Sequence, residues 1–138
     1  MKDKGPIWLK RDERMSTPGY SVGKRRMIRF ASKHMREETF PMTLAHEIGH
    51  AVAPPTESRL PTTTLGWQIW LDEVSAWEWA LDRLPPEEID ARKLRLELGS
   101  YLHHVIEKSY GRDSPEYEEA RRQLEELVAK AEEKKGLV

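Results

Sequence analysis

The chain has 138 residues, of which 38% are hydrophobic and 34% are charged. We expect a single compact domain over residues 1–138, frayed over about the first six, because this length can bury a core of its own. The absence of cysteine excludes disulfides, thiol catalysis and thiolate zinc ligation. No apolar run resembles a signal peptide or is long enough to span a membrane, so we expect a soluble, cytoplasmic protein with no membrane partner.

The charge is unevenly distributed, although the net charge is only −1. Residues 1–36 carry eleven lysines and arginines against three acidic residues, a net charge of +8, which leaves −9 for residues 37–138. We favour the interpretation that this basic segment packs beside the acidic helices. The alternative is a basic surface that recruits an acidic protein or a nucleic acid.

The first third of the chain predicts short strands. Residues 7–9 form a short apolar run, and residues 16–19, Ser-Thr-Pro-Gly, predict a turn. Residues 20–31 favour a strand, because Ile28 and Phe30 alternate with charged residues. We therefore expect a small antiparallel sheet of two or three strands.

The segment before Pro54 predicts a helix that carries the most informative motif of the chain, H-E-x-x-H. His46 and His50 stand four residues apart on one face of this helix, close enough for both imidazoles to reach one ion. Glu47 lies about 100° round the helix from His46, beside the position of the metal. The motif predicts a zinc site in which Glu47 takes a proton from the attacking water.

A second helix is predicted from about residue 66 to Leu84. Glu73 lies in its apolar stripe, and a buried carboxylate needs a partner, because an unpaired one costs several kcal/mol or becomes protonated. That partner could be the zinc ion. The alternatives are an ion pair with Arg59 or Arg29, or exposure at the edge of the stripe. The neighbouring acidic residues of this helix are expected on exposed faces, and Trp77 is expected to pack in the core. These acidic residues are Asp72 and Glu78.

Two further helices are predicted towards the end of the chain. One begins at Pro86, with acidic residues at its positive end, and runs to about Tyr110, where Gly111 stops it. The other is capped by Ser114 and runs from about residue 115 to 134. Both are expected to serve mainly as packing scaffold.

The first of these scaffold helices contains the adjacent histidines His103 and His104. We expect one of them to face inwards and the other outwards. An inward histidine could stabilise the oxyanion of a transition state, as could Tyr101 or Tyr110. The simpler and favoured interpretation is a hydrogen-bonded structural or surface histidine.

Two segments together resemble a known group of enzymes. Residues 43–51, TLAHEIGHA, and residues 73–80, EVSAWEWA, resemble the gluzincin metallopeptidases. The second segment is particularly similar to ImmA/IrrE-type peptidases, and the small size is similar to that of the minigluzincins. The resemblance covers roughly residues 24–84. It implies that one zinc ion is held by His46, His50 and Glu73, with Glu47 as general base and acid.

The resemblance also implies that the strand near residues 26–31 is an edge strand along which an extended substrate lies. Two departures from related patterns matter. Ala53 and Thr56 stand where metzincins require a glycine and a third histidine, which excludes that clan. Trp77 stands where many larger gluzincins place an aspartate that supports a histidine ligand, so this support must come from elsewhere.

The sequence thus predicts an α+β zincin-like domain: a small antiparallel sheet beside the H-E-x-x-H helix and the glutamate helix, with two further C-terminal helices. The predicted function is zinc-dependent hydrolysis of peptide bonds in a protein or peptide substrate. The alternative is a zinc-binding regulatory or interaction module without catalytic activity. Glu47 argues against that alternative, since a structural site needs no base beside its ligands. A third hypothesis, not favoured, is a nucleic-acid-directed protein that uses the basic residues 1–36. The sequence does not indicate an oligomeric state.

Overall fold

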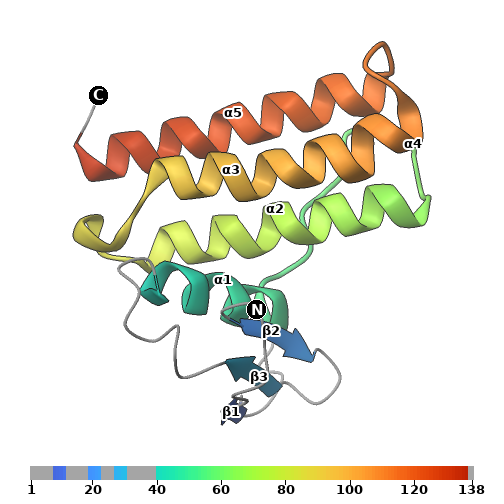
Figure 1. The fold of residues 1–138 in the computed structure, drawn as a ribbon. Coiled ribbons are helices and arrows are strands. Elements are labelled where there is room, and N and C mark those ends of the chain that lie inside the picture. Colours follow the sequence, from blue (N-terminus) through green and yellow to red (C-terminus); the bar gives the residue numbers. More distant parts are fainter. Residues whose placement is uncertain (1–7, 12–18, 23–26, 31–39, 137–138) are drawn as a thin grey trace.

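The computed structural model describes residues 8–11, 19–22, 27–30 and 40–136. The later part of the chain forms a layered group of helices, in which α2, α3 and α5 lie side by side and α1 packs against α2 (Figure 1). The helical elements are, in chain order, α1 (Phe40–Val52), α2 (Leu65–Arg83), the 3-10 turn η3 (Pro86–Glu88), α3 (Ala91–Tyr101), the π-helical segment η4 (Leu102–Glu107), α4 (Lys108–Tyr110) and α5 (Pro115–Lys135).

Local sequence signals define most of the helix ends. Helix α1 ends before Pro54 and Pro55, which cannot donate a backbone hydrogen bond. At the start of α5, the Ser114 side chain accepts a hydrogen bond from the backbone N–H of Tyr117, as its predicted role as a cap requires. Gly111 follows α4 with φ +82°, a conformation that favours glycine.

The predicted helix from Pro86 to Tyr110 is not continuous. Its first residues form the separate turn η3, and α3 begins only after Asp90, whose side chain accepts hydrogen bonds from the backbone N–H groups of Arg92 and Lys93. Asp90 is therefore the N-cap of α3, and the predicted start of this helix at Pro86 was too early. After α3 the helix widens into the π-helical segment η4.

The hydrophobic core lies between the helices. Large apolar side chains of α2 meet those of α3, η4 and α5, and Met42 adds a contribution from α1. The largest completely buried members are Trp67, Trp70, Trp77, Met42, Leu81, Ile89, Leu94, Leu98 and Ile106. These helices therefore form the framework on which the functional groups of α1 and α2 are held.

The predicted α+β class is wrong. The packed part of the described chain, residues 40–136, is all-helical, and every core residue that the structure describes lies between Met42 and Ala131. The prediction treated the alternating residues near residue 28 as part of a sheet that defines the fold. In the structure the apolar stripes of the helices pack against one another and form the core without a sheet.

Three four-residue strands lie beyond α1: β1 (Trp8–Arg11), β2 (Gly19–Val22) and β3 (Met27–Phe30) (Figure 1). Their order is β1-β3-β2, with β3 parallel to β1 and antiparallel to β2. The arrangement is thus mixed rather than antiparallel. Strand β3 is paired on both sides, so the expectation that it forms a free edge for a substrate is also wrong. Strand β2 comes nearest to α1.

None of the helices in the described ranges is long and apolar enough to cross a membrane. Of the basic segment, residues 1–36, the structure describes the backbone of the three strands and no side chains, and the first six residues, which were expected to fray, lie outside the described residues. Both interpretations of the basic segment therefore stay predictions.

Candidate metal centre

The site lies beside a close contact between the backbones of α1 and α2. A Cβ atom added to Gly49 would lie 2.5 Å from the backbone oxygen of Ala76 and 3.0 Å from its Cα. Ala76 itself is completely buried. Only glycine at this position of α1 permits such an approach, and the contact lies within one turn of His46 and His50 on one helix and of Glu73 on the other.

Three side chains converge beside this contact. The Nε2 atom of His46 lies 3.0 Å from Oε1 of Glu73, and the Nε2 atom of His50 lies 2.7 Å from Oε2 of the same carboxylate. One potential ligand atom from each residue lies within 4.8 Å of the others. The three residues therefore form a group that could hold one metal ion, as the two separate motifs predicted.

The group is removed from solvent. Glu73 is only 5% exposed and His46 only 8% exposed. Burial alone raises the pKa of Glu73, but hydrogen bonds from His46 and His50 lower that pKa to about 2. The predicted partner of this buried carboxylate is thus the pair of histidines, and the alternative of an ion pair with Arg29 or Arg59 is not needed to explain its burial.

The two imidazoles have different electrostatic environments. Burial lowers the pKa of His46, and the neighbouring Glu73 only partly opposes this shift. Burial also lowers the pKa of His50, but hydrogen bonds to Asp72 and Glu73 overcome it and raise the pKa to about 10. A neutral imidazole is the form that ligates a metal, so His46 needs no loss of a proton at neutral pH whereas His50 does.

The two histidines are also held by different contacts. The His46 ring stacks on Trp77 with a centroid separation of 4.0 Å and an interplanar angle of 10°. His50 instead has its Nδ1 atom 2.8 Å from Oδ2 of Asp72. Asp72 is exposed, as the sequence predicted, but its contact with His50 was not predicted. The available signal was its position next to Glu73, on the turn that meets α1.

Two further groups border the site. The Glu47 side chain is 12% exposed, with Oε1 3.7 Å from Nδ1 of His46. Tyr101, at the end of α3, is 36% exposed. Burial of its phenol, the negative charges of Glu73 and Glu47, and a hydrogen bond with Glu73 together raise the pKa of Tyr101 to about 12. Tyr101 therefore lies close to both carboxylates and stays protonated at neutral pH.

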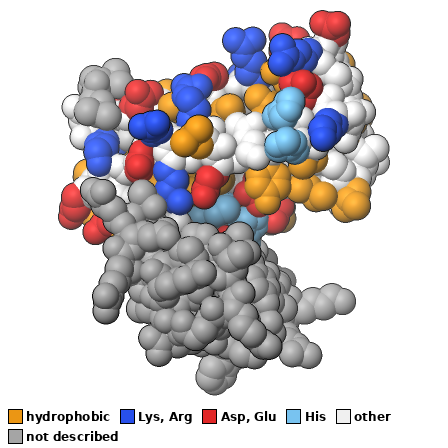
Figure 2. All heavy atoms as spheres, viewed as in Figure 1, with side chains coloured by type: hydrophobic (Ala, Val, Ile, Leu, Met, Phe, Trp, Pro, Cys, Tyr) orange, Lys and Arg blue, Asp and Glu red, His pale blue; other side chains and the backbone are white. Residues whose placement is uncertain are grey.

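The other predicted stabilising residues lie elsewhere. His103 and His104 are both exposed, because Leu102 and Ile106 are the residues of η4 that enter the core. His103 pairs with Glu107 at 3.4 Å. Tyr110 is hydrogen-bonded to Thr64 and packs edge-on against a tryptophan. Figure 2 shows histidine side chains in two separate places on this face of the molecule. The expectation that one of the adjacent histidines faces inwards is wrong.

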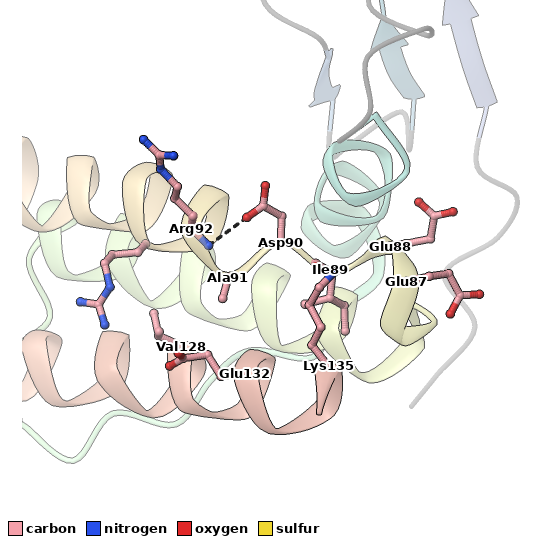
Figure 3. A pocket seen from close by; sticks show the side chains of 10 residues that line it. Glu87, Glu88, Ile89, Asp90, Ala91, Arg92, Val128, Glu132 and Lys135 are labelled. Atoms are coloured by element: carbon pink, nitrogen blue, oxygen red, sulfur yellow. Dashed lines mark hydrogen bonds between the residues drawn. The ribbon is translucent and has the colours of Figure 1, made fainter. Parts of the chain in front are cut away.

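The structure has a hollow beside the candidate site and a larger one away from it. One of about 300 Å³ lies beside His50 and Asp72, between the end of α1 and the first half of α2. A larger one of about 590 Å³ lies between η3, the start of α3 and the end of α5, lined by both acidic and basic side chains (Figure 3). The larger hollow contains no residue of the His-His-Glu group, so the size of a hollow does not identify the candidate metal site.

Comparison of the chain with protein-family models, with curated proteins and with solved structures finds no match.

Proposed function

We propose that the protein is a zinc-dependent peptidase of the gluzincin type, in which His46, His50 and Glu73 hold one zinc ion. The observation that carries the proposal is the convergence of two imidazole Nε2 atoms on one buried carboxylate, beside a further glutamate. Two nitrogen donors and one oxygen donor match the three protein ligands of catalytic zinc sites, which leave a fourth position for water or substrate.

The donor set also suits a divalent cation, because it offers imidazole nitrogens and a carboxylate oxygen within reach of one ion. The Glu73 carboxylate and both histidines are largely withdrawn from water, where an uncompensated charge is costly. A structural zinc site normally closes all four positions with protein, and the group identified among the described residues supplies three. When bound, zinc would polarise the scissile carbonyl and make water acidic enough to act as a nucleophile at neutral pH.

Glu47 is proposed as the general base and acid. It follows His46 directly on α1. The negative charge of its carboxylate contributes to the raised pKa of Tyr101, so Glu47 and Tyr101 border the same site. From there it would take a proton from the attacking water and then deliver that proton to the leaving amine. General acid–base catalysis of this kind contributes about 10²–10⁴-fold to a rate.

Tyr101 is proposed as the group that stabilises the oxygen of the attacked carbonyl. Its pKa of about 12 keeps the hydroxyl protonated, so it can donate a hydrogen bond where negative charge develops. The phenol lies close enough to Glu73 and Glu47 for these carboxylates to raise its pKa, so it borders the His-His-Glu group. His103, His104 and Tyr110 are not part of the proposed machinery, because their contacts lie elsewhere.

The proposal is tested by metal analysis together with a peptidase assay on the full chain. Purified wild type should contain one zinc per chain and cleave members of a mixed peptide library, followed by mass spectrometry. Glu73→Gln and His46→Ala should lose most of the zinc. Glu47→Gln should retain it and lose activity by about 10²–10⁴-fold.

Each of the other outcomes contradicts a defined part of the proposal. A wild type that binds no zinc would remove the metal site. Full activity in Glu47→Gln would exclude Glu47 as the base. Zinc binding without cleavage of any library member would favour the alternative, a zinc-containing regulatory or interaction module. His103→Ala serves as the control, because this exposed histidine should affect neither zinc content nor activity.

A further inference from the structure

The asymmetry between the two histidines points to a role for Asp72. The His46 ring is fixed by stacking on Trp77, and its Nδ1 atom is 3.7 Å from the nearest Glu47 oxygen, which is too far for a hydrogen bond. The His50 ring has its Nδ1 atom 2.8 Å from Asp72, a normal hydrogen-bond distance. Packing therefore orients one ligand, and a carboxylate orients the other.

We propose that Asp72 is a positioning residue that fixes the ring orientation and tautomer of His50 for metal binding. This inference rests on the proposed metal site. An imidazole that donates its Nδ1–H to a carboxylate carries the lone pair on Nε2, the atom available to a metal. In this structure Nε2 of His50 is the atom that faces Glu73, at 2.7 Å.

The surroundings of Asp72 suit this role. Its side chain is 60% exposed, whereas the His50 side chain is only 12% exposed. The carboxylate therefore keeps most of its hydration while one oxygen reaches the buried ring, so orienting His50 requires little desolvation of a charge. The pair borders the hollow of about 300 Å³, where Leu71 and Ser75 also contribute to the wall.

The consecutive positions of Asp72 and Glu73 make the arrangement geometrically simple. Both residues project from the same turn of α2, and His50 lies between their carboxylates, with Nδ1 towards Asp72 and Nε2 towards Glu73. Each nitrogen of the His50 imidazole is thus contacted by a carboxylate, and the two carboxylates belong to consecutive residues of α2. A carboxylate on the far nitrogen raises the basicity of a ligating histidine as well as fixing its direction.

The first test measures zinc affinity of the full chain by competition with a chromophoric chelator. Asp72→Ala should weaken zinc binding by about 10–100-fold, the usual effect of removing such a partner. Asp72→Asn keeps an acceptor oxygen but not the charge, so its loss should be smaller. Glu78→Ala removes another exposed carboxylate from the same helix and should leave the affinity unchanged.

The second test observes the His50 ring directly by ¹⁵N–¹H NMR. The Nδ1-bound proton should exchange slowly with water in the wild type, in both zinc-loaded and zinc-free protein, and should lose this protection in Asp72→Ala. Unchanged zinc affinity in Asp72→Ala would overturn the proposal. A weaker affinity with an unchanged ring signal would also overturn it, because Asp72 would then act through its charge and not by positioning.

The two proposals fail in different ways. If the wild type binds no zinc, the proposed function fails, while the ring signal of the zinc-free protein still decides whether Asp72 orients His50. If Asp72→Ala does not fold, as judged by circular dichroism, Asp72→Leu takes its place, because leucine also lacks an acceptor for the Nδ1–H group of His50. A zinc affinity or a ring signal of that variant identical to that of the wild type would overturn the proposal.

Discussion

Helix α2 packs against α1 on one side and against α3, η4 and α5 elsewhere, and these two contacts differ in kind. The first contains the candidate metal site, and the second forms the scaffold. Against α1 it packs through Gly49 and Ala76, and the side chains at this contact include buried polar groups. Against α3, η4 and α5 it packs mainly through large apolar side chains, with the ion pair between Asp82 of α2 and Lys130 of α5 at the surface. Figure 2 shows charged side chains of both signs spread over the outer surface of these helices.

The close approach of the α1 and α2 backbones therefore positions the candidate site, whereas apolar burial between α2 and the other helices stabilises the fold. At the α1–α2 contact the absence of a side chain at Gly49 lets the two backbones approach closely, and His46, His50 and Glu73 converge beside this contact. The contacts of α5 instead bury leucine, valine and alanine side chains, and removing this apolar surface from water stabilises the fold. Substitutions in the scaffold should therefore change stability without changing the site, and substitutions at the α1–α2 contact should change both.

The largest expected effect is in the scaffold. Leu94 on α3 is completely buried, so Leu94→Ala should lower the free energy of unfolding by about 2–5 kcal/mol through lost burial and the cavity left behind. Denaturant unfolding in the presence of a chelator measures this change. The zinc affinity of the folded variant should equal that of wild type, and a parallel loss of affinity would contradict the separation of scaffold from site.

Zinc itself should stabilise the protein by a comparable amount. At a free zinc concentration of one hundred times the Kd, the free energy of unfolding should rise by about 2.7 kcal/mol, because only the folded chain brings the ligands together. The increment is the difference between unfolding curves with zinc and with chelator. It should persist in Leu94→Ala and disappear in Glu73→Gln, whereas an equal increment in both variants would place the metal elsewhere.

The helix contact gives a paired prediction of opposite sign. Gly49→Ala should destabilise the protein by about 1–3 kcal/mol and weaken zinc binding, because the new methyl group meets the backbone of Ala76. Gly99→Ala is the matched control in α3, where no atom lies within 4 Å of the added Cβ. It should stabilise the protein by about 0.5–1 kcal/mol through helix propensity. The same sign for both variants would contradict a close α1–α2 contact.

The smallest expected effect concerns a surface ion pair of α5. Arg122 lies 2.6 Å from Glu119 and lowers the pKa of that carboxyl, so the pair contributes stability above the ordinary pKa of about 4.5 and loses it as the pH falls through the folded value. Glu119→Gln should therefore cost about 0.2–1 kcal/mol at pH 7 and nothing below the folded pKa. Urea unfolding of both proteins at several pH values measures this difference. A difference independent of pH would exclude the ion pair as its cause.

Sequence reasoning succeeded where a single helix determines the outcome. The spacing of His46 and His50 follows from helix geometry, and a carboxylate in the apolar stripe of α2 indicated that Glu73 would be buried with a partner. The caps and proline stops are equally local, which is why the bounds of α1, α2 and α5 lay close to those expected.

It did less well where two elements must be placed relative to each other. The role of Asp72 depends on how closely α1 approaches α2, which is decided by the contact of Gly49 with the Ala76 backbone and cannot be read from either helix alone. The pairing of β3 on both sides likewise depends on segments distant in the chain. The exposure of both His103 and His104 reflects the π-helical geometry of η4, which the residue pattern did not predict.

That π-helical segment has a consequence for the two tyrosines on either side of it. Tyr101 and Tyr110 are nine residues apart, roughly two and a half turns of a regular α-helix, and would project in opposite directions from one. The wider turns of Leu102–Glu107 remove this mismatch, since both tyrosines reach α2, one near Glu73 and the other at Thr64. This single stretch of altered helix winding thus allows Tyr110 to bond Thr64 at the start of α2 while Tyr101 borders Glu73 in the candidate metal site.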